Sequence, residues 1–467
     1  MRDIGLTAYS LLVIWVTGFL LIRRLGLFRG QFPSFVYGAA LGIGGGALSL
    51  VLLVTSGVTG RLHLIYGYLL FLGAAVPSAW PAREAKRGPI VSSVKRRVSI
   101  SELCLLGVLA SIVLAMIVSG TFGTLARDGW AVWAFKAKVF FLSRQVDLAF
   151  LMDDPRFGFA HLDYPLLLPL VEWWVYSHLG HVNDSVVRLV HVGYYLSLLA
   201  AFYGSLRAYI GRTVVTLCTL LLALLGPAVV NTLDGYADLI QGYYVFLAFV
   251  SFVDWIHGGR AGELASAGVS LSLGAHVKTE GLSWLAAMTA VVVLGAWLAR
   301  KEWSTRGKAL LVFLAITVPV SGMWLLYRWV FHIPLSPITR WLTFDLVAAR
   351  LPLIVGAFQT EFGVRALWQQ GWGLLWAFTL LGCLGALATR SPSRWRTLWY
   401  WSPLLLQGLI VLGFYLLTAA PLKWHLETSL TRVLLQYAPC GLWASAATLL
   451  PGEPFKLHRR RDYARPE

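Results

Sequence analysis

The chain contains the run Ser101-Glu-Leu-Cys-Leu-Leu-Gly-Val-Leu-Ala-Ser-Ile-Val-Leu-Ala-Met-Ile-Val-Ser-Gly-Thr-Phe122, which is apolar beyond its first residues. A helix of this length can cross the hydrocarbon core of a bilayer, which is roughly 30 Å thick. Shortly after it come Asp128-Gly-Trp-Ala-Val-Trp-Ala-Phe-Lys-Ala-Lys138 and, beyond a spacer, His161-Leu-Asp-Tyr-Pro165. Charged side chains are costly beside a bilayer, so a membrane protein that keeps them there usually uses them. We therefore expect a membrane span followed by a functional loop.

Similar apolar runs recur along the whole 467-residue chain, in which 58% of the residues are hydrophobic and 13% are charged. This composition is far from that of an ordinary soluble domain. It predicts an all-α, polytopic membrane protein with about 13 transmembrane helices and with interfacial helices in the first large external loop. The expected spans cover residues 8–22, 34–55, 62–80, 101–122, 187–207, 213–231, 239–256, 262–276, 281–299, 308–329, 371–389, 398–418 and 429–449.

The basic residues account for the net charge of +17 without a nucleic-acid partner. They gather in short connections between spans, for example at Arg83–Arg97, Arg207–Arg212 and Arg390–Arg396. Membrane proteins concentrate such residues on the cytoplasmic side. If all these connections are cytoplasmic, the spans alternate with the N-terminus outside and the C-terminus inside. We thus expect a multi-pass protein of the inner or plasma membrane, with its active site on the external, periplasmic face.

The chain divides into three expected parts. Residues 1–100 form an N-terminal three-helix extension, residues 101–450 the main transmembrane module, and residues 451–467 a basic cytoplasmic tail. The apolar segment Leu166–Gly180 is expected to lie in or on the membrane interface, because counting it as a span would place the connection Arg207–Arg212 outside. Four of its side chains suit the level of the lipid headgroups: Trp173, Trp174, Tyr176 and His178.

Three carboxylates at external span ends are the candidate catalytic residues. Asp128 follows one span, and Asp234-Gly-Tyr-Ala-Asp238 places two carboxylates four residues apart at another, so one helix face could hold both. Asp128 alone could equally be a charge that marks the membrane boundary. Together these residues could act as a general base and an orienting group, or Asp128 and Asp238 could hold a divalent cation.

Cations occur at the same expected face. Lys278 and Glu280 stand in a polar insertion between two apolar runs, and Arg432 lies near the start of the last span with His425 close before it. Lys278 and Arg432 could bind phosphate. They could also serve only structure, since Lys278 can pair with Glu280, and an arginine near a span end is often an anchor that extends toward the headgroups.

The first external loop supplies the remaining candidate substrate-binding residues. Lys136 and Lys138 lie among tryptophans and phenylalanines, which suit an amphipathic interfacial helix and also stack on sugar rings. His161, Asp163 and Tyr164 lie just before the expected interfacial helix, and a solvated loop histidine is the simple alternative for His161. The chain has no phosphate-cradling GxxxxGK[ST] sequence, which disfavours nucleotide-driven transport.

These motifs resemble the GT-C class of integral-membrane glycosyltransferases, and among them the bacterial relatives of the protein O-mannosyltransferases and the aminoarabinose transferase of lipid A. The resemblance covers roughly residues 101 to 440. Four elements carry it: Arg127-Asp128-Gly-Trp, His161-Leu-Asp-Tyr-Pro165, Gly235-Tyr-Ala-Asp238 and Lys278-Thr-Glu-Gly281. The chain departs from the usual pattern in having three spans ahead of the catalytic loop, and in His161-Leu-Asp where His-Pro is more usual.

The resemblance implies a GT-C-like fold and transfer of a sugar from a polyprenyl-phosphate donor to a glycan, lipid or protein acceptor on the outer face. It implies that Asp128 is the catalytic base and that Asp238, with Asp234 as a further candidate, matches the second acidic site. The chemistry agrees, because the acceptor hydroxyl needs a base and the departing phosphate needs cations, for which Lys278, Arg432 and His425 are candidates. Direct displacement would invert the anomeric centre.

Two other functions stay open. A lipid-linked glycan ligase or polymerase would share the carrier and the external site, but would need room for a long glycan near residues 331–370. A lipid or glycan flippase would need polar residues near the middle of the bilayer, whereas here they gather at one boundary. The sequence demands no cofactor, and a divalent cation remains an alternative at Asp128 and Asp238.

Overall fold

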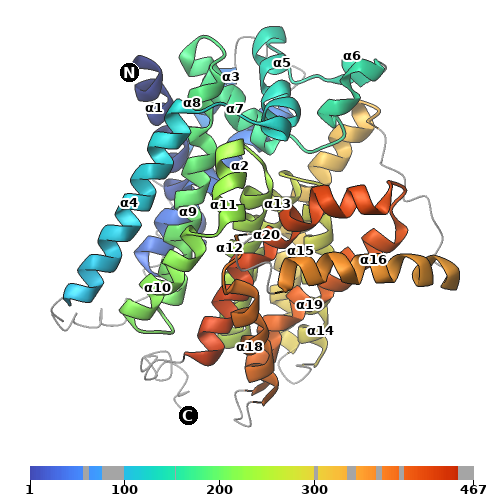
Figure 1. Ribbon diagram of the computed structural model, residues 1–467. Helices are drawn as coiled ribbons and strands as arrows, with labels where there is room; N and C mark the ends of the chain where they lie inside the picture. Colours follow the sequence, from blue (N-terminus) through green and yellow to red (C-terminus); the bar gives the residue numbers. More distant parts are fainter. Residues whose placement is uncertain are drawn as a thin grey trace.

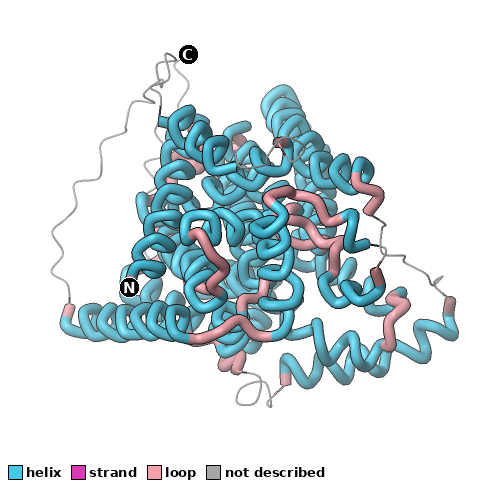
Figure 2. Tube along the Cα trace, turned by 90° about the horizontal axis from the view of Figure 1, so that it is seen from above, coloured by secondary structure: helices cyan, strands magenta, loops and turns pink. Residues whose placement is uncertain are grey.

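The computed structural model describes residues 1–55, 63–75, 99–152, 154–298, 303–333, 343–363, 371–388 and 394–450. The expected basic tail 451–467, the whole of the connection Arg83–Arg97 and part of the 331–370 loop lie outside these ranges. Over the described residues the chain is helical and has no strand, and Figure 2 shows helices joined by loops. The expectation of an all-α protein is therefore confirmed.

The helices follow one another along the whole chain (Figure 1). They are α1 (Arg2–Leu25), α2 (Pro33–Val54), α3 (His63–Ala75), α4 (Ile100–Phe122), the π-helix η1 (Gly129–Ala134), α5 (Phe135–Ser143), α6 (Ala149–Met152), the 3₁₀-helix η2 (Pro155–Ala160), α7 (Leu167–Leu179), α8 (Asp184–Val187), α9 (Leu189–Leu206), α10 (Arg212–Ala223), α11 (Gly226–Asp234), α12 (Asp238–Gly258), α13 (Ala261–Ala275), α14 (Glu280–Leu298), α15 (Trp303–Val330), α16 (Phe344–Phe362), α18 (Leu375–Ala388), α19 (Arg394–Leu417) and α20 (Leu422–Leu449).

Eight helices among the described residues are long and apolar enough to cross a membrane, which fits a multi-pass membrane protein. They are α1, α2, α4, α8 with α9, α12, α14, and most of α15 and α19. A ninth span arises if α10 and α11 count as one, although the chain bends by 54° between them. The bend replaces the straight span expected over 213–231. Gly226 and Pro227 cause it, because proline favours the first turn of a new helix.

The helix α12 forms the centre of the molecule. Every residue from Asp238 to Trp255 is buried, and the helix packs against α9, α13 and α20. Its sequence is apolar around its whole circumference, which is typical of a helix enclosed by other helices. Because Asp238 is the first residue of this central helix, its carboxylate is held inside the protein and not at its rim.

The helix α7 differs from its expected position at the lipid headgroups. Trp173, Trp174 and Tyr176 are buried, and α7 packs against α1, α2 and α5. The Trp174 indole donates a hydrogen bond of 3.2 Å to the backbone oxygen of Ser10 on α1. These aromatic side chains therefore contact protein, and their expected role as headgroup anchors is wrong. The first two helices cover α7 and, through α2, also pack on α9.

The first of the segments expected on the external face, residues 123–186, lies at one end of the molecule. The helices α5, α6, α7 and α8 gather at the top of Figure 1, and the C-terminus lies at the opposite end. The backbone ties two of the expected external segments together, because Leu167 N–H donates to the His276 carbonyl at 2.9 Å. The start of α7 thus fixes the turn that carries Lys278.

Candidate active site

Arg432 lies at the centre of a network of ion pairs that joins four distant parts of the chain. Its Nη1 donates to Asp128 at 2.6 Å, and its Nε donates to Asp238 at 2.9 Å. Lys278 Nζ donates to the other oxygen of Asp238 at 2.6 Å and pairs with Glu280 at 2.8 Å. The structure thus brings together five of the residues that the sequence singled out, across 304 positions of the chain in the case of Asp128 and Arg432.

The two carboxylates held by Arg432 have different surroundings. The Asp238 side chain is fully buried, and both of its oxygens accept charged hydrogen bonds. The Asp128 side chain is 39% exposed and accepts a hydrogen bond from Arg432. A carboxylate whose oxygens are both occupied holds cations in place, whereas one that is open to solvent can reach a substrate proton. Of the two carboxylates, Asp128 is therefore the one that a substrate could reach, and Asp238 is the one that holds both Lys278 and Arg432.

The backbone around Asp128 is fixed by close packing on the end of α11. Ala126 N–H donates to the Asp234 carbonyl at 3.1 Å, and a Cβ on Gly129 would lie 2.0 Å from that same oxygen. Only glycine fits there. Arg127 adopts a φ of 36°, a left-handed conformation that is uncommon for a residue with a side chain. Such backbone strain is often found at functional sites, where the surrounding structure holds it.

Asp234 lies apart from the ion pairs of Arg432. It ends α11, and the charges that act on its carboxylate are those of Arg188 and Arg127. Its backbone carbonyl, not its side chain, is what fixes the Asp128 loop. The structure therefore separates the two carboxylates of the Asp234-Gly-Tyr-Ala-Asp238 motif into different environments, although they are four residues apart. Gly235 makes the separation possible, because its φ of 80° ends one helix before the next begins.

Two side chains that sequence reasoning did not single out complete the surroundings of Arg432. The Tyr236 ring lies under the guanidinium, with its centroid 4.8 Å from Cζ, in a cation–π arrangement. Gln436, one helical turn after Arg432 on α20, places Nε2 3.5 Å from Asp238. The spacing of four residues between Arg432 and Gln436 is the signal that could have identified the glutamine.

Tyr164 forms the wall of the site beside Lys278. Its ring centroid is 5.9 Å from Lys278 Nζ and 5.6 Å from Lys136 Nζ, and its ring stacks on that of His161 at 4.9 Å. Burial raises the pKa of the Tyr164 hydroxyl, so it stays protonated and can donate a hydrogen bond. Asp163 lies 4.0 Å from His161 Nδ1. Partial desolvation lowers the pKa of the His161 imidazole, which is half exposed, and Asp163 acts in the opposite direction.

Two candidate substrate-binding residues are engaged elsewhere. Lys138 donates to Asp184 at 2.6 Å, and Asp184 also accepts a hydrogen bond from the Tyr176 hydroxyl at 2.8 Å. His425 lies two helical turns before Arg432 on α20, where its Nδ1 is 3.0 Å from the Thr418 hydroxyl. Neither side chain takes part in the ion pairs around Asp238.

The space between Asp128 and Asp238 holds the Arg432 guanidinium, where a divalent cation bridging the two carboxylates would have to lie. Among the described residues, no group of three or more histidine, cysteine, aspartate or glutamate side chains could hold a metal ion. The carboxylates of Asp128 and Asp238 are thus bridged by the Arg432 guanidinium. The four cysteines carry free thiols.

Comparison with known proteins returned no match: no protein-family model matches the chain, and no curated protein and no solved structure is significantly similar to it.

Proposed function

We propose that this chain is a GT-C-type glycosyltransferase of the inner or plasma membrane, with about 13 transmembrane helices. In this proposal it moves a sugar from a polyprenyl-phosphate carrier to an acceptor hydroxyl on the external face, with inversion. The observation that carries the proposal is the partly exposed carboxylate of Asp128, hydrogen-bonded to Arg432 beside the buried Lys278. A base next to cations is what displacement of a phosphate by a hydroxyl requires.

In the proposed reaction the acceptor oxygen attacks the anomeric carbon of the donor sugar. Asp128 takes the hydroxyl proton as the new carbon–oxygen bond forms. The bond between the anomeric carbon and the phosphate oxygen breaks, and its electron pair remains on the carrier phosphate. Arg432 and Lys278 stabilise the negative charge that develops there, while Asp238 keeps both cations in position. No metal takes part in these steps.

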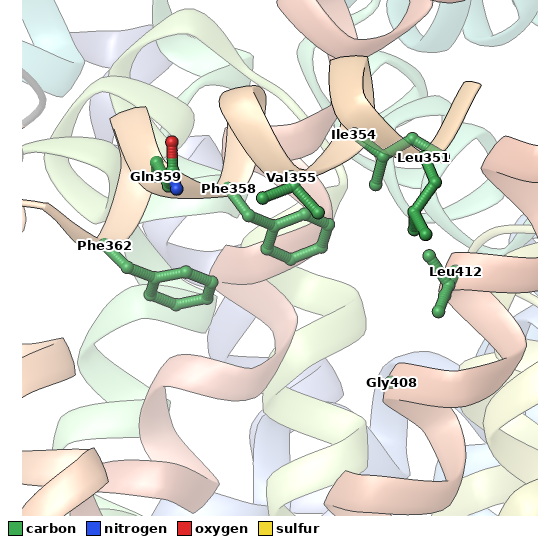
Figure 3. A pocket seen from close by; sticks show the side chains of 8 residues that line it. All are labelled: Leu351, Ile354, Val355, Phe358, Gln359, Phe362, Gly408 and Leu412. Carbon is green, nitrogen blue, oxygen red and sulfur yellow. The ribbon is translucent and has the colours of Figure 1, made fainter. Parts of the chain in front are cut away.

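An apolar groove of about 400 Å³ offers a place for the carrier chain (Figure 3). It lies between α16 and α19 and has a single polar side chain, Gln359, in its wall. The apolar side chains that line it are Leu351, Ile354, Val355, Phe358, Phe362 and Leu412. In Figure 1, α16 runs across the direction of most other helices.

The groove is linked to the ion-pair network through one glutamate. Glu361 precedes Phe362 in the groove wall, and its carboxylate accepts a hydrogen bond of 2.6 Å from the Thr431 hydroxyl. Thr431 immediately precedes Arg432 on α20. A carrier whose tail lies along α16 would therefore end near the helix turn that presents the guanidinium.

The test is turnover of a panel of polyprenyl-phosphate sugars by the full chain in bilayer nanodiscs, with release of polyprenyl phosphate as the measured product. We expect at least one donor to be consumed and Asp128→Asn to lower kcat by about 10²–10⁴-fold. Asp154→Asn is the matched control, because Asp154 lies in the same loop and pairs with the exposed Arg156. Full activity of Asp128→Asn would overturn the assignment of the base, and no turnover of any donor would overturn the function.

A further inference from the structure

Lys136 is a buried cation that the proposed reaction does not use. Its side chain on α5 is 0% exposed, and Nζ makes no hydrogen bond with any described residue. An ammonium group taken out of water without a hydrogen-bond partner is strongly unfavourable. Lys138, two residues later on the same helix, forms an ion pair with the carboxylate of Asp184. The isolation of Lys136 therefore calls for a reason other than stability.

Two aromatic rings are the groups closest to its charge. Lys136 Nζ lies 5.1 Å from the centroid of the Trp133 ring and 5.6 Å from that of Tyr164. These two rings stack on each other at 5.6 Å. A cation is attracted to the faces of such rings, and the attraction is larger away from water. Lys136 thus contacts, through Tyr164, the wall of the site that faces Lys278.

Burial and the neighbouring carboxylates act in opposite directions on the pKa of Lys136. Burial lowers the pKa of its ammonium group to about 7, and the carboxylates of Asp163 and Glu172 act in the opposite direction. Glu172 lies on α7 and is held by His191 at 3.0 Å. His161 and Tyr164 are further titratable side chains near Lys136, and both Lys136 and Lys278 disfavour the charged form of His161.

We propose that Lys136 is a positioning residue whose protonated form holds Tyr164 against Lys278, so that binding of an anionic donor is coupled to uptake of a proton. The proposal rests on the function proposed above. A phosphodiester at Lys278 and Arg432 adds negative charge near Tyr164, the ring that both lysines approach, and this favours the charged form of Lys136. By linkage, protonation of Lys136 must favour the anion to the same extent.

The first experiment measures kcat/KM for the donor between pH 5.5 and 9. A polyprenyl-phosphate sugar is a phosphodiester and does not titrate in this range, so the pH dependence belongs to the protein. We expect kcat/KM of the wild type to fall as the pH rises through about 7. Lys136→Arg, which stays charged, should keep its activity to pH 8.5. Lys136→Met should lose about tenfold at pH 6 and have no fall near pH 7.

The matched control is Lys138→Met, which should keep the wild-type pH profile because Lys138 pairs with Asp184. A pH profile of Lys136→Arg that is identical to the wild type would overturn the proposal. So would full activity of Lys136→Met at pH 6, since the role requires the charge and not the bulk of the side chain.

A second experiment does not depend on turnover. Calorimetric titration with dibutyl phosphate, a phosphodiester that does not titrate, in two buffers of different ionisation enthalpy counts the protons taken up at pH 7. We expect a fraction of a proton per bound anion in the wild type and none in Lys136→Met. If no donor is consumed but this difference is found, the enzyme proposal fails and the role of Lys136 stands. Equal proton uptake in both proteins, or no binding of the anion by the wild type, would overturn that role.

Discussion

Lys278 and Lys136 are both buried and both lie within 6 Å of the Tyr164 ring. Their pKa values are nevertheless shifted in opposite directions. Burial acts against the charge of Lys278, but the carboxylates of Asp238 and Glu280 raise its pKa above the usual value. Lys136 has no such contact, and burial lowers its pKa to about 7. The contacting carboxylate, not the degree of burial, therefore decides which lysine is a permanent cation and which can titrate.

Removing the carboxylate that Lys278 and Arg432 share should have the largest effect. Asp238→Asn leaves two cations facing a neutral amide, and we expect the free energy of unfolding to fall by about 3–5 kcal/mol. Asp128→Asn, which removes the partly exposed partner of the same arginine, should cost less than about 1 kcal/mol. Titration with dodecyl sulfate in mixed micelles measures both values. Equal losses in the two variants would contradict the different roles given to these carboxylates.

Only one of the two lysines should be needed for stability when each is replaced by methionine. Lys278→Met leaves Asp238 with Arg432 as its one cation, and we expect a loss of about 3 kcal/mol. Lys136→Met removes a buried charge that has no hydrogen bond, so the protein should keep its stability or gain some. The same micelle titration, run at pH 6 where Lys136 is charged, compares them. A large loss in Lys136→Met would mean that its charge is satisfied in a way that the structure does not record.

How the unfolding free energy depends on pH should separate the lysines again. Between pH 7 and about 10, unfolded Lys136 binds a proton that the folded state has released. The unfolded state then binds more protons, so stability should rise with pH, by at most about 1.4 kcal/mol per unit. Lys136→Met should abolish this contribution, whereas Lys138→Met should keep it. A rise that persists unchanged in Lys136→Met would assign it to another group.

Part of this arrangement could be predicted from the sequence, because the positions of the arginines predict which connections share one side of the membrane. Placing the basic connections on one side put Asp128, Asp238, Lys278 and Arg432 on the other, and the structure joins these four by ion pairs. Their roles in catalysis stay predictions. Hydropathy carries such information because apolar length and charge position are both local properties of the chain.

What could not be predicted depends on contacts between distant segments. Tryptophan and tyrosine suit both a membrane interface and a protein core, so the composition of α7 could not show that α1 and α2 bury it. Likewise the partner of Lys138 is 46 residues away, so the sequence could not show that, of the two lysines on α5, Lys136 is the one near Tyr164. Gly226 and Pro227 favour a break between α10 and α11. They stand within a run of apolar residues that also fits one continuous span, so the sequence did not decide between the two.

The smaller loss of stability among the two ion-paired lysines belongs to the third lysine of this comparison, Lys138. Its contact with Asp184 is as short as that of Lys278 with Asp238, at 2.6 Å. The side chains of Lys138 and Asp184 are, however, 19% and 26% exposed. Water screens such a pair, and Asp184 keeps the Tyr176 hydroxyl when the lysine is removed. Lys138→Met should therefore lose less than about 1 kcal/mol, and less still at 1 M salt than at 0.05 M, where screening is weak. A loss as large as that of Lys278→Met, unchanged by salt, would show that the distance between the charges and not their exposure governs these ion pairs.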